Sequence, residues 1–214
     1  VASVRYSPES PTLHIEYDGE RTNALKLVDF LRLCGVVPAV VLRHDLSAPS
    51  VRSASEKLQP FLRHRRVGYF SMEIALRSDI PTYSGGLGVL AGDSLRSAAD
   101  LRIPLVGVTL VSREGYFRQS FDADGRQVEE PDPWSPPAAA EALPAKVSVE
   151  IGGREVWIGG WLYVVEGVNG GRQPVVRLDT GLTENEPRDR GITDRLYGGD
   201  AAYCLSQEIV LGIG

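Results

Sequence analysis

The stretch that decides the fold is residues 67–111, VGYFSMEIALRSDIPTYSGGLGVLAGDSLRSAADLRIPLVGVTLV. Val67–Phe70 predicts a short buried strand, and Ile103–Val111 is a near-continuous apolar run typical of a parallel strand covered on both faces. Between them, residues 85–101 predict an amphipathic helix opened by glycines, because apolar residues recur there at helical spacing: Leu87, Leu90, Ala91, Leu95, Ala98 and Leu101. Strand, glycine turn, helix and strand together predict a βαβ unit and an α/β fold class.

Beyond Glu114 the apolar pattern changes to a period of two. It predicts antiparallel hairpins, with turns at Asp124-Gly125 and Gly152-Gly153 and strands near residues 116–121, 146–151, 155–165 and 174–178. Residues 131–144 and 183–194 are expected to be loops. Asp200 is expected to cap a helix that runs from Ala201 through Ile209.

Residues 1–66 carry weaker signals. Residues 12–17 predict a strand, and residues 23–33 have helix-like spacing. The run 63–66 is interpreted as a solvated boundary before the next strand. The chain begins at Val1 and ends in the apolar run IVLGIG, so we expect a fragment of a longer protein.

Bulk composition excludes several classes of function. The net charge of -5 leaves no basic excess for nucleic acid, so we expect none as a partner. The longest apolar run is far shorter than a membrane helix requires, so we expect no membrane association. Cys34 and Cys204 lie far apart in the sequence and lack the spacing of a zinc site, and two cysteines do not indicate a disulfide scaffold. This use of cysteine fits a reducing cytoplasm. His14, His44 and His64 have no partners at useful spacing, so we assign no metal.

The strongest local signal for chemistry is Ser84-Gly85-Gly86-Leu87-Gly88 at the start of the predicted helix. Glycines allow backbone amides to approach an anion, and a helix N-terminus is electropositive, so the motif predicts a phosphate site. The dinucleotide pattern G-x-G-x-x-[G/A] also matches residues 86–91, but residues 75–83 separate the strand from the glycines. The alternative is a glycine turn tightened only for helix–sheet packing.

Residues 67–119 closely resemble the N-terminal region of the α-glucan phosphorylases, particularly the bacterial and archaeal short forms. The resemblance resumes at 129–136 (EEPDPWSP) and at 178–214 (LDTGLTENEPRDRGITDRLYGGDAAYCLSQEIVLGIG), in the order that the family has them. Residues 1–66 match poorly. The departures are Ser84, where many relatives have asparagine, and Cys204 and Ser206, where relatives are usually basic.

The resemblance implies that residues 67–214 are part of the first Rossmann-like domain of a two-domain glycosyltransferase of the GT-B type. That domain would comprise the βαβ unit with the glycine loop 84–88, a β-hairpin region 115–180, and a gate loop and helix 195–214. The family transfers the terminal α-1,4-glucosyl unit of glycogen, starch or maltodextrin to orthophosphate, which gives glucose 1-phosphate. Its pyridoxal phosphate is attached to a lysine of the second domain, which would be absent here, so the isolated chain is expected to be inactive. The full-length parent is expected to be cytoplasmic and could form a homodimer.

The family's site residues carry over to specific positions. Gly86, Leu87 and Asp200 fall on catalytic positions, and Glu73, Ser84, Gly85 and Gly86 fall on the cofactor side. The glucan and orthophosphate would contact Gly85, Gly86, Leu87, Gly88 and Asp200, the last of which falls on the loop that gates the cleft.

Each of these assignments has a plainer alternative. Glu73 could pair with Arg77 at i+4, and Asp200 could be no more than a helix cap. The aromatic residues are expected to serve core and hairpin packing rather than sugar binding: Tyr116, Phe117, Trp134, Trp157 and Trp161. For the whole protein, the alternatives are a synthase-like nucleotide-sugar glucosyltransferase, whose loop typically has lysine where Ser84 stands, and a non-catalytic carbohydrate-binding fragment.

Overall fold

The computed structural model describes residues 61 and 67–214, together with the backbone of residues 3–7 and 10–16. Near the N-terminus, β1 (Ser3–Ser7) pairs with β2 (Ser10–Glu16) in an antiparallel ribbon. The strand predicted at 12–17 is thus confirmed as β2. The helix predicted at 23–33 and the basic run 63–66 lie outside the described residues.

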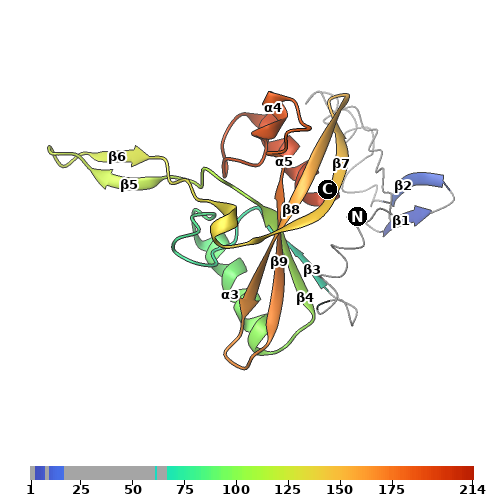
Figure 1. Ribbon diagram of the computed structural model, residues 1–214, viewed down its shortest axis with the longest axis horizontal. Coiled ribbons are helices and arrows are strands. Elements are labelled where there is room, and N and C mark those ends of the chain that lie inside the picture. Colours follow the sequence, from blue (N-terminus) through green and yellow to red (C-terminus); the bar gives the residue numbers. More distant parts are fainter. Residues whose placement is uncertain (1–2, 8–9, 17–60, 62–66) are drawn as a thin grey trace.

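The central feature is a five-stranded mixed sheet with the order β3-β4-β9-β8-β7 (Figure 1). β3 (Val67–Phe70) pairs parallel with β4 (Leu105–Leu110), and β4 pairs parallel with β9 (Arg172–Asp179). β8 (Arg154–Glu166) pairs antiparallel with both β9 and β7 (Glu141–Ile151). The fold is therefore α/β with a partly parallel sheet, to which the predicted hairpins add strands.

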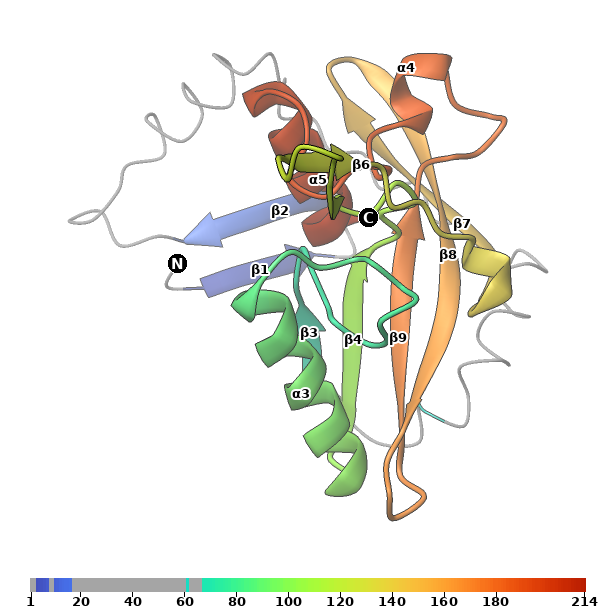
Figure 2. The same cartoon turned by 90° about the vertical axis from the view of Figure 1, so that its left-hand side faces the viewer.

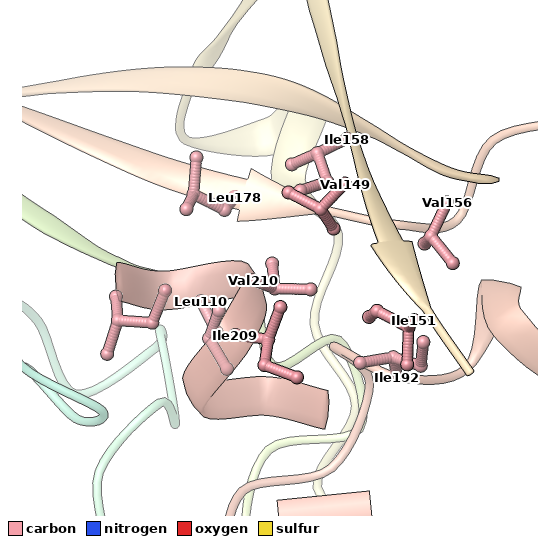
Figure 3. Close-up of a cluster of buried hydrophobic side chains, with 10 residues drawn as sticks. Leu110, Val149, Ile151, Val156, Ile158, Leu178, Ile192, Ile209 and Val210 are labelled. Carbon is pink, nitrogen blue, oxygen red and sulfur yellow. The ribbon is translucent and has the colours of Figure 1, made fainter. Parts of the chain in front are cut away.

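Two helices cover opposite faces of this sheet (Figure 2). α3 (Gly86–Asp100) joins β3 to β4 and packs Ala91, Leu95 and Ala99 against Val175 of β9. α5 (Ala201–Ile213) packs Ile209, Val210 and Leu211 against Leu178 of the same strand. Because side chains alternate between the faces of a strand, Val175 and Leu178 point to opposite sides, and the two cores lie on opposite faces. Figure 3 shows the second core, in which α5 meets residues of β4, β7, β8 and β9.

The predicted βαβ unit is confirmed, but its burial was predicted incorrectly in two places. Val67 and Phe70 are exposed because β3 is the edge strand of the sheet in the described part of the chain. Leu87, Leu90 and Leu101 are also exposed. The helix turns Gly88, Ala91, Gly92 and Leu95 toward the sheet instead, and it ends at Asp100, before Leu101. The buried stripe consists mostly of small residues, so the helix lies close to the sheet.

The remaining elements refine the predicted loops. β5 (Arg118–Phe121) and β6 (Gln127–Glu130) form a separate hairpin that projects from the body (Figure 1). The loop prediction for 131–144 was wrong at its end, because a 3₁₀ turn (Pro136–Ala138) leads into β7 at Glu141, and Pro144 sits at a register shift. A short helix, α4 (Pro187–Arg190), interrupts the loop predicted at 183–194.

Candidate functional site

The candidate site lies where the three parallel strands end. β3, β4 and β9 run in the same direction, so their carboxyl ends at Phe70, Leu110 and Asp179 meet at one edge of the sheet. Ligands of open α/β sheets bind in the crevice outside the carboxyl ends of the strands. The segment that follows β3 carries Glu73 and the glycine loop, so the topology brings the sequence-predicted residues to this edge.

Glu73 caps the helix that the glycine loop opens. Gly85 is the N-cap of α3 and has no side chain to accept the first amide hydrogens. Glu73 is only 2% exposed, and its carboxylate accepts hydrogen bonds from the amides of Ser84 (2.6 Å) and Gly88 (2.9 Å). A carboxylate at this place also faces the positive end of the helix dipole. Glu73 therefore positions the glycine loop from eleven residues upstream.

The alternative ion pair between Glu73 and Arg77 is wrong. Arg77 instead donates to Asp79 through Nε (2.8 Å), an exposed contact that raises the pKa of the arginine and lowers the pKa of the aspartate. Glu73 is turned inward to the amides, so its environment is set by the loop and not by a surface cation.

The glycines of the loop have two different roles. A Cβ placed on Gly88 would lie 2.5 Å from Cβ of Tyr83 and 3.2 Å from the carboxyl carbon of Glu73, so Gly88 allows close packing. A Cβ on Gly85 or Gly86 would meet nothing within 4 Å. The packing-turn alternative therefore accounts for Gly88 but not for Gly85 and Gly86. Gly86 and Leu87 are the first helical residues, so their amides have no intrahelical acceptor.

The gate segment 195–200 approaches the same place. The amide of Leu196 in this segment donates to Gly115 O (3.1 Å) after β4, and just before the segment Asp194 O accepts from the amide of Glu114 (2.9 Å). Tyr197, with a left-handed φ of 53°, brings its hydroxyl close to Glu73. Partial burial and the nearby Glu73 carboxylate raise the pKa of this hydroxyl. Sequence reasoning passed over Tyr197, because nothing in a local pattern indicates this long-range approach.

Asp200 is the helix cap that its position predicted. Its Oδ1 accepts from the amide of Tyr203 (2.9 Å), and the residue is exposed. One carboxylate oxygen of Asp200 thus serves as the cap of α5. The catalytic assignment of Asp200 stays a prediction.

A buried cation that sequence reasoning missed lies beneath this edge of the sheet. Arg177 of β9 is 0% exposed, and burial lowers its pKa to about 10. Its Nη1 donates to Thr82 Oγ1 (3.1 Å), and its guanidinium carbon lies 5.2 Å from the centre of the Trp134 ring. Nε and Nη2 have no partner among the described residues. The available signal was the alternation of β9, which places Arg177 on the same face as buried Val175.

No three His, Cys, Asp or Glu side chains within the described ranges are placed to hold a metal ion. In the same ranges, no helix has the length and apolar character to cross a membrane.

Together, the fold and the site define a class: an α/β domain with a glycine-opened helix at the carboxyl edge of parallel strands. Comparison with known proteins shows which family this domain is similar to. A family model described as carbohydrate phosphorylase matches residues 74–157, which include the glycine loop, α3 and β4. The predicted resemblance to the α-glucan phosphorylases is therefore confirmed.

Individual relatives agree with the family model. A glycogen phosphorylase of Mycobacterium tuberculosis is 44% identical over 155 residues, which cover 69% of this chain and 18% of the relative. A maltodextrin phosphorylase of Thermococcus litoralis is 39% identical over 153 residues, which cover 68% of this chain and 18% of the relative. A glycogen phosphorylase of Aquifex aeolicus is 37% identical over 154 residues, which cover 68% of this chain and 21% of the relative. The chain thus spans about a fifth of the length of these relatives.

Proposed function

We propose that this chain is part of the first domain of an α-glucan phosphorylase. In this proposal, β3, α3 and β4 begin a Rossmann-like domain of a GT-B fold, and residues 67–214 are its N-terminal portion. The complete protein would transfer the terminal α-1,4-glucosyl unit of glycogen, starch or maltodextrin to orthophosphate and release glucose 1-phosphate. The observation that carries the proposal is the open backbone of Gly85 and Gly86 at the start of α3, within the segment that the family model matches.

The glycine loop fits a role in holding anionic and sugar oxygens. The amides of Gly86 and Leu87 are free of intrahelical acceptors, and space lies beside Gly85 and Gly86. Fixed amide donors aimed at developing charge commonly contribute ~2.7–4 kcal/mol to the stability of a transition state. Gly86 and Leu87 would supply these donors, and Gly88 would keep the helix close to Glu73.

Pyridoxal phosphate is the cofactor that the family implies, and its phosphate would exchange a proton with the orthophosphate. The chain's own residues fit one side of such a group. Gly85 and Gly86 offer backbone without obstruction, whereas the Ser84 amide is already bonded to Glu73. Lys146, the only lysine in the described part of the chain, is exposed and paired with Glu184, so the attachment lysine would come from elsewhere in the protein.

Glu73 and Tyr197 would act as positioning residues. Glu73 fixes Ser84 and Gly88 on the two sides of the loop, so the intervening amides keep one orientation. Tyr197 approaches the same carboxylate from the gate segment, so a movement of that segment would change the surroundings of Glu73 and of the loop that it holds. Asp200, by capping α5, would set where the gate segment ends. For the parent we also propose a cytoplasmic location and a homodimer.

The complete protein provides the test. Expressed from its full gene, it should bind pyridoxal phosphate and release glucose 1-phosphate from maltodextrin and orthophosphate without a nucleotide sugar. Synthesis of glucan from a nucleotide-glucose donor, independent of orthophosphate, would falsify the assignment in favour of a synthase-like enzyme. Glucan binding without either activity would favour a carbohydrate-binding module.

A further inference from the structure

Arg177 of β9 is a charged side chain that is buried at a cost in stability. It is 0% exposed, and its Nε and Nη2 have no partner among the described residues. Burial lowers its pKa only to about 10, so the guanidinium stays charged at neutral pH. Burying an ion carries a large desolvation penalty, and an apolar residue in its place is often neutral or stabilising. Packing alone therefore does not explain an arginine at this position.

The hydrogen bond that Arg177 makes leads to the segment between β3 and α3. Its Nη1 donates to Oγ1 of buried Thr82 (3.1 Å), and that hydroxyl donates in turn to the carbonyl oxygen of Ile74 (3.3 Å). The backbone amide of Ile74 donates back to Thr82 O (3.3 Å). Hydrogen bonds in such a buried chain polarise one another, so the charged donor at its start strengthens the bond at its end. Arg177 thus helps to close the loop 75–81 at its base.

The base of this loop carries the residues that hold the glycine loop. Glu73 directly precedes Ile74, and Ser84 follows Thr82 by two residues. The Glu73 carboxylate accepts from the amides of Ser84 (2.6 Å) and Gly88 (2.9 Å). The contact between Ile74 and Thr82 therefore determines where Glu73 meets the start of α3. A shift of Thr82 would reach the amides of the glycine loop through only two residues.

Trp134 holds the guanidinium of Arg177 from another side. The guanidinium carbon lies 5.2 Å from the centre of the Trp134 ring, within the range of a cation–π interaction. The indole N–H of Trp134 is shared between Ser112 O (2.8 Å) and Val111 O (3.1 Å), directly after β4, so Trp134 serves packing as its sequence predicted. Arg177 is therefore fixed between the carboxyl end of β4 and the base of the loop 75–81.

We propose that Arg177 is a positioning residue, which fixes the orientation of the glycine loop through Thr82 and so sets where the amides of Gly86 and Leu87 point. It acts through Thr82 and not on a ligand, because its side chain is fully buried. A charge that costs stability and gives the loop one orientation is a common trade at functional sites. The inference rests on the proposed function for the reaction that is measured, and it adds a role for a residue of β9.

The test compares Arg177→Met and Thr82→Val in the full-length protein. Each removes one partner of the hydrogen bond and keeps a side chain of similar size. Each should lower the kcat of phosphorolysis per folded molecule by roughly tenfold, while the KM for maltodextrin stays within about twofold, because misplaced amides act on the transition state. The double variant should be no slower than either single variant, because both substitutions act through the same bond.

Arg172→Met is the matched control. Arg172 is the first residue of β9, at the opposite end of the strand, and its side chain is 55% exposed beside Glu166. The same substitution there should leave kcat unchanged. Amide hydrogen exchange, measured by mass spectrometry on the same proteins, gives a readout that does not depend on activity. Exchange in the segment 84–88 should become several-fold faster in Arg177→Met and not in Arg172→Met, although the melting temperature of Arg177→Met does not fall.

The possible outcomes separate this inference from the proposed function. An unchanged kcat in Arg177→Met overturns the role of Arg177, and so does an equal fall in Arg172→Met or a double variant slowed by the product of the two single effects. If the wild type shows no phosphorolysis, the proposed function fails, and the exchange measurement still tests Arg177. Faster exchange at 84–88 in Arg177→Met and Thr82→Val, but not in Arg172→Met, supports the positioning role. Unchanged exchange overturns it.

Discussion

Gly86→Val and Gly88→Val provide a test of the two glycine roles within one helical turn. In Gly86→Val, the new side chain meets nothing within 4 Å, and the position has no left-handed φ, so the fold should accept it with a change in stability of about 1 kcal/mol or less. The valine would, however, fill the space through which a ligand approaches the amides of Gly86 and Leu87. Loss of such donors should lower phosphorolysis by about 10²–10³-fold.

Gly88→Val should have the opposite profile. Its Cβ would lie 2.5 Å from Cβ of Tyr83, about 1 Å inside normal contact, with Glu73 directly behind. Overpacking of this kind typically costs ~1–3 kcal/mol, which corresponds to a fall of a few °C in melting temperature.

Phosphorolysis rate per folded molecule, bound pyridoxal phosphate and the thermal melt should be measured on the same preparations of the full-length protein. Full specific activity in Gly86→Val would contradict a ligand-binding role for the amides of Gly86 and Leu87. An equal loss of melting temperature in Gly86→Val and Gly88→Val would contradict the difference between the two glycines.

Three further substitutions test the surroundings of the loop. Glu73→Gln turns one carboxylate acceptor into an N–H donor that faces an amide, and should lower the free energy of unfolding by ~1–3 kcal/mol in urea; an unchanged midpoint would contradict the capping role. Arg177→Met removes a buried, incompletely bonded cation, and should leave stability unchanged or raise it by ~1–4 kcal/mol; a clear loss would show that the contacts with Thr82 and Trp134 outweigh desolvation. Asp200→Ala should lower stability by ~1 kcal/mol, and Asp200→Asn should restore most of it in a thermal melt. A full loss in Asp200→Asn would mean that charge, not capping, stabilises α5.

The sequence predicted the elements of the fold better than their burial. The helix 85–101, the strand 103–111 and the Asp200 cap depend on local spacing and local hydrogen bonds, and the structure contains all three. Periodicity shows which residues share a face, but not whether another element covers that face. Leu87 and Leu90 therefore belonged to a correctly predicted helix and still proved to be exposed.

The candidate site was predictable in its backbone and not in its long-range contacts. The glycine motif identified the helix start because a glycine's effect on the chain is local. The bond between Glu73 and Gly88 spans fifteen residues, and the approach of Tyr197 to Glu73 spans most of the described chain. Such contacts depend on how β3, α3 and the gate segment pack in three dimensions. No local pattern in the sequence therefore reveals these contacts.

The carboxylate of Glu73 behind the glycine loop limits which ligands the loop can bind by itself. Glu73 places a negative charge against the buried side of the loop, so an anion on the open side is attracted by amides and repelled by a carboxylate. Two unit charges about 6 Å apart repel by ~3 kcal/mol at an effective dielectric constant near 20. That is comparable to the ~2.7–4 kcal/mol that well-placed donors supply, and a dianionic phosphate would be repelled more strongly. Under the proposed function, the loop would therefore orient an anion rather than hold it alone, and tight phosphate binding would require cations from outside the segments around Gly86.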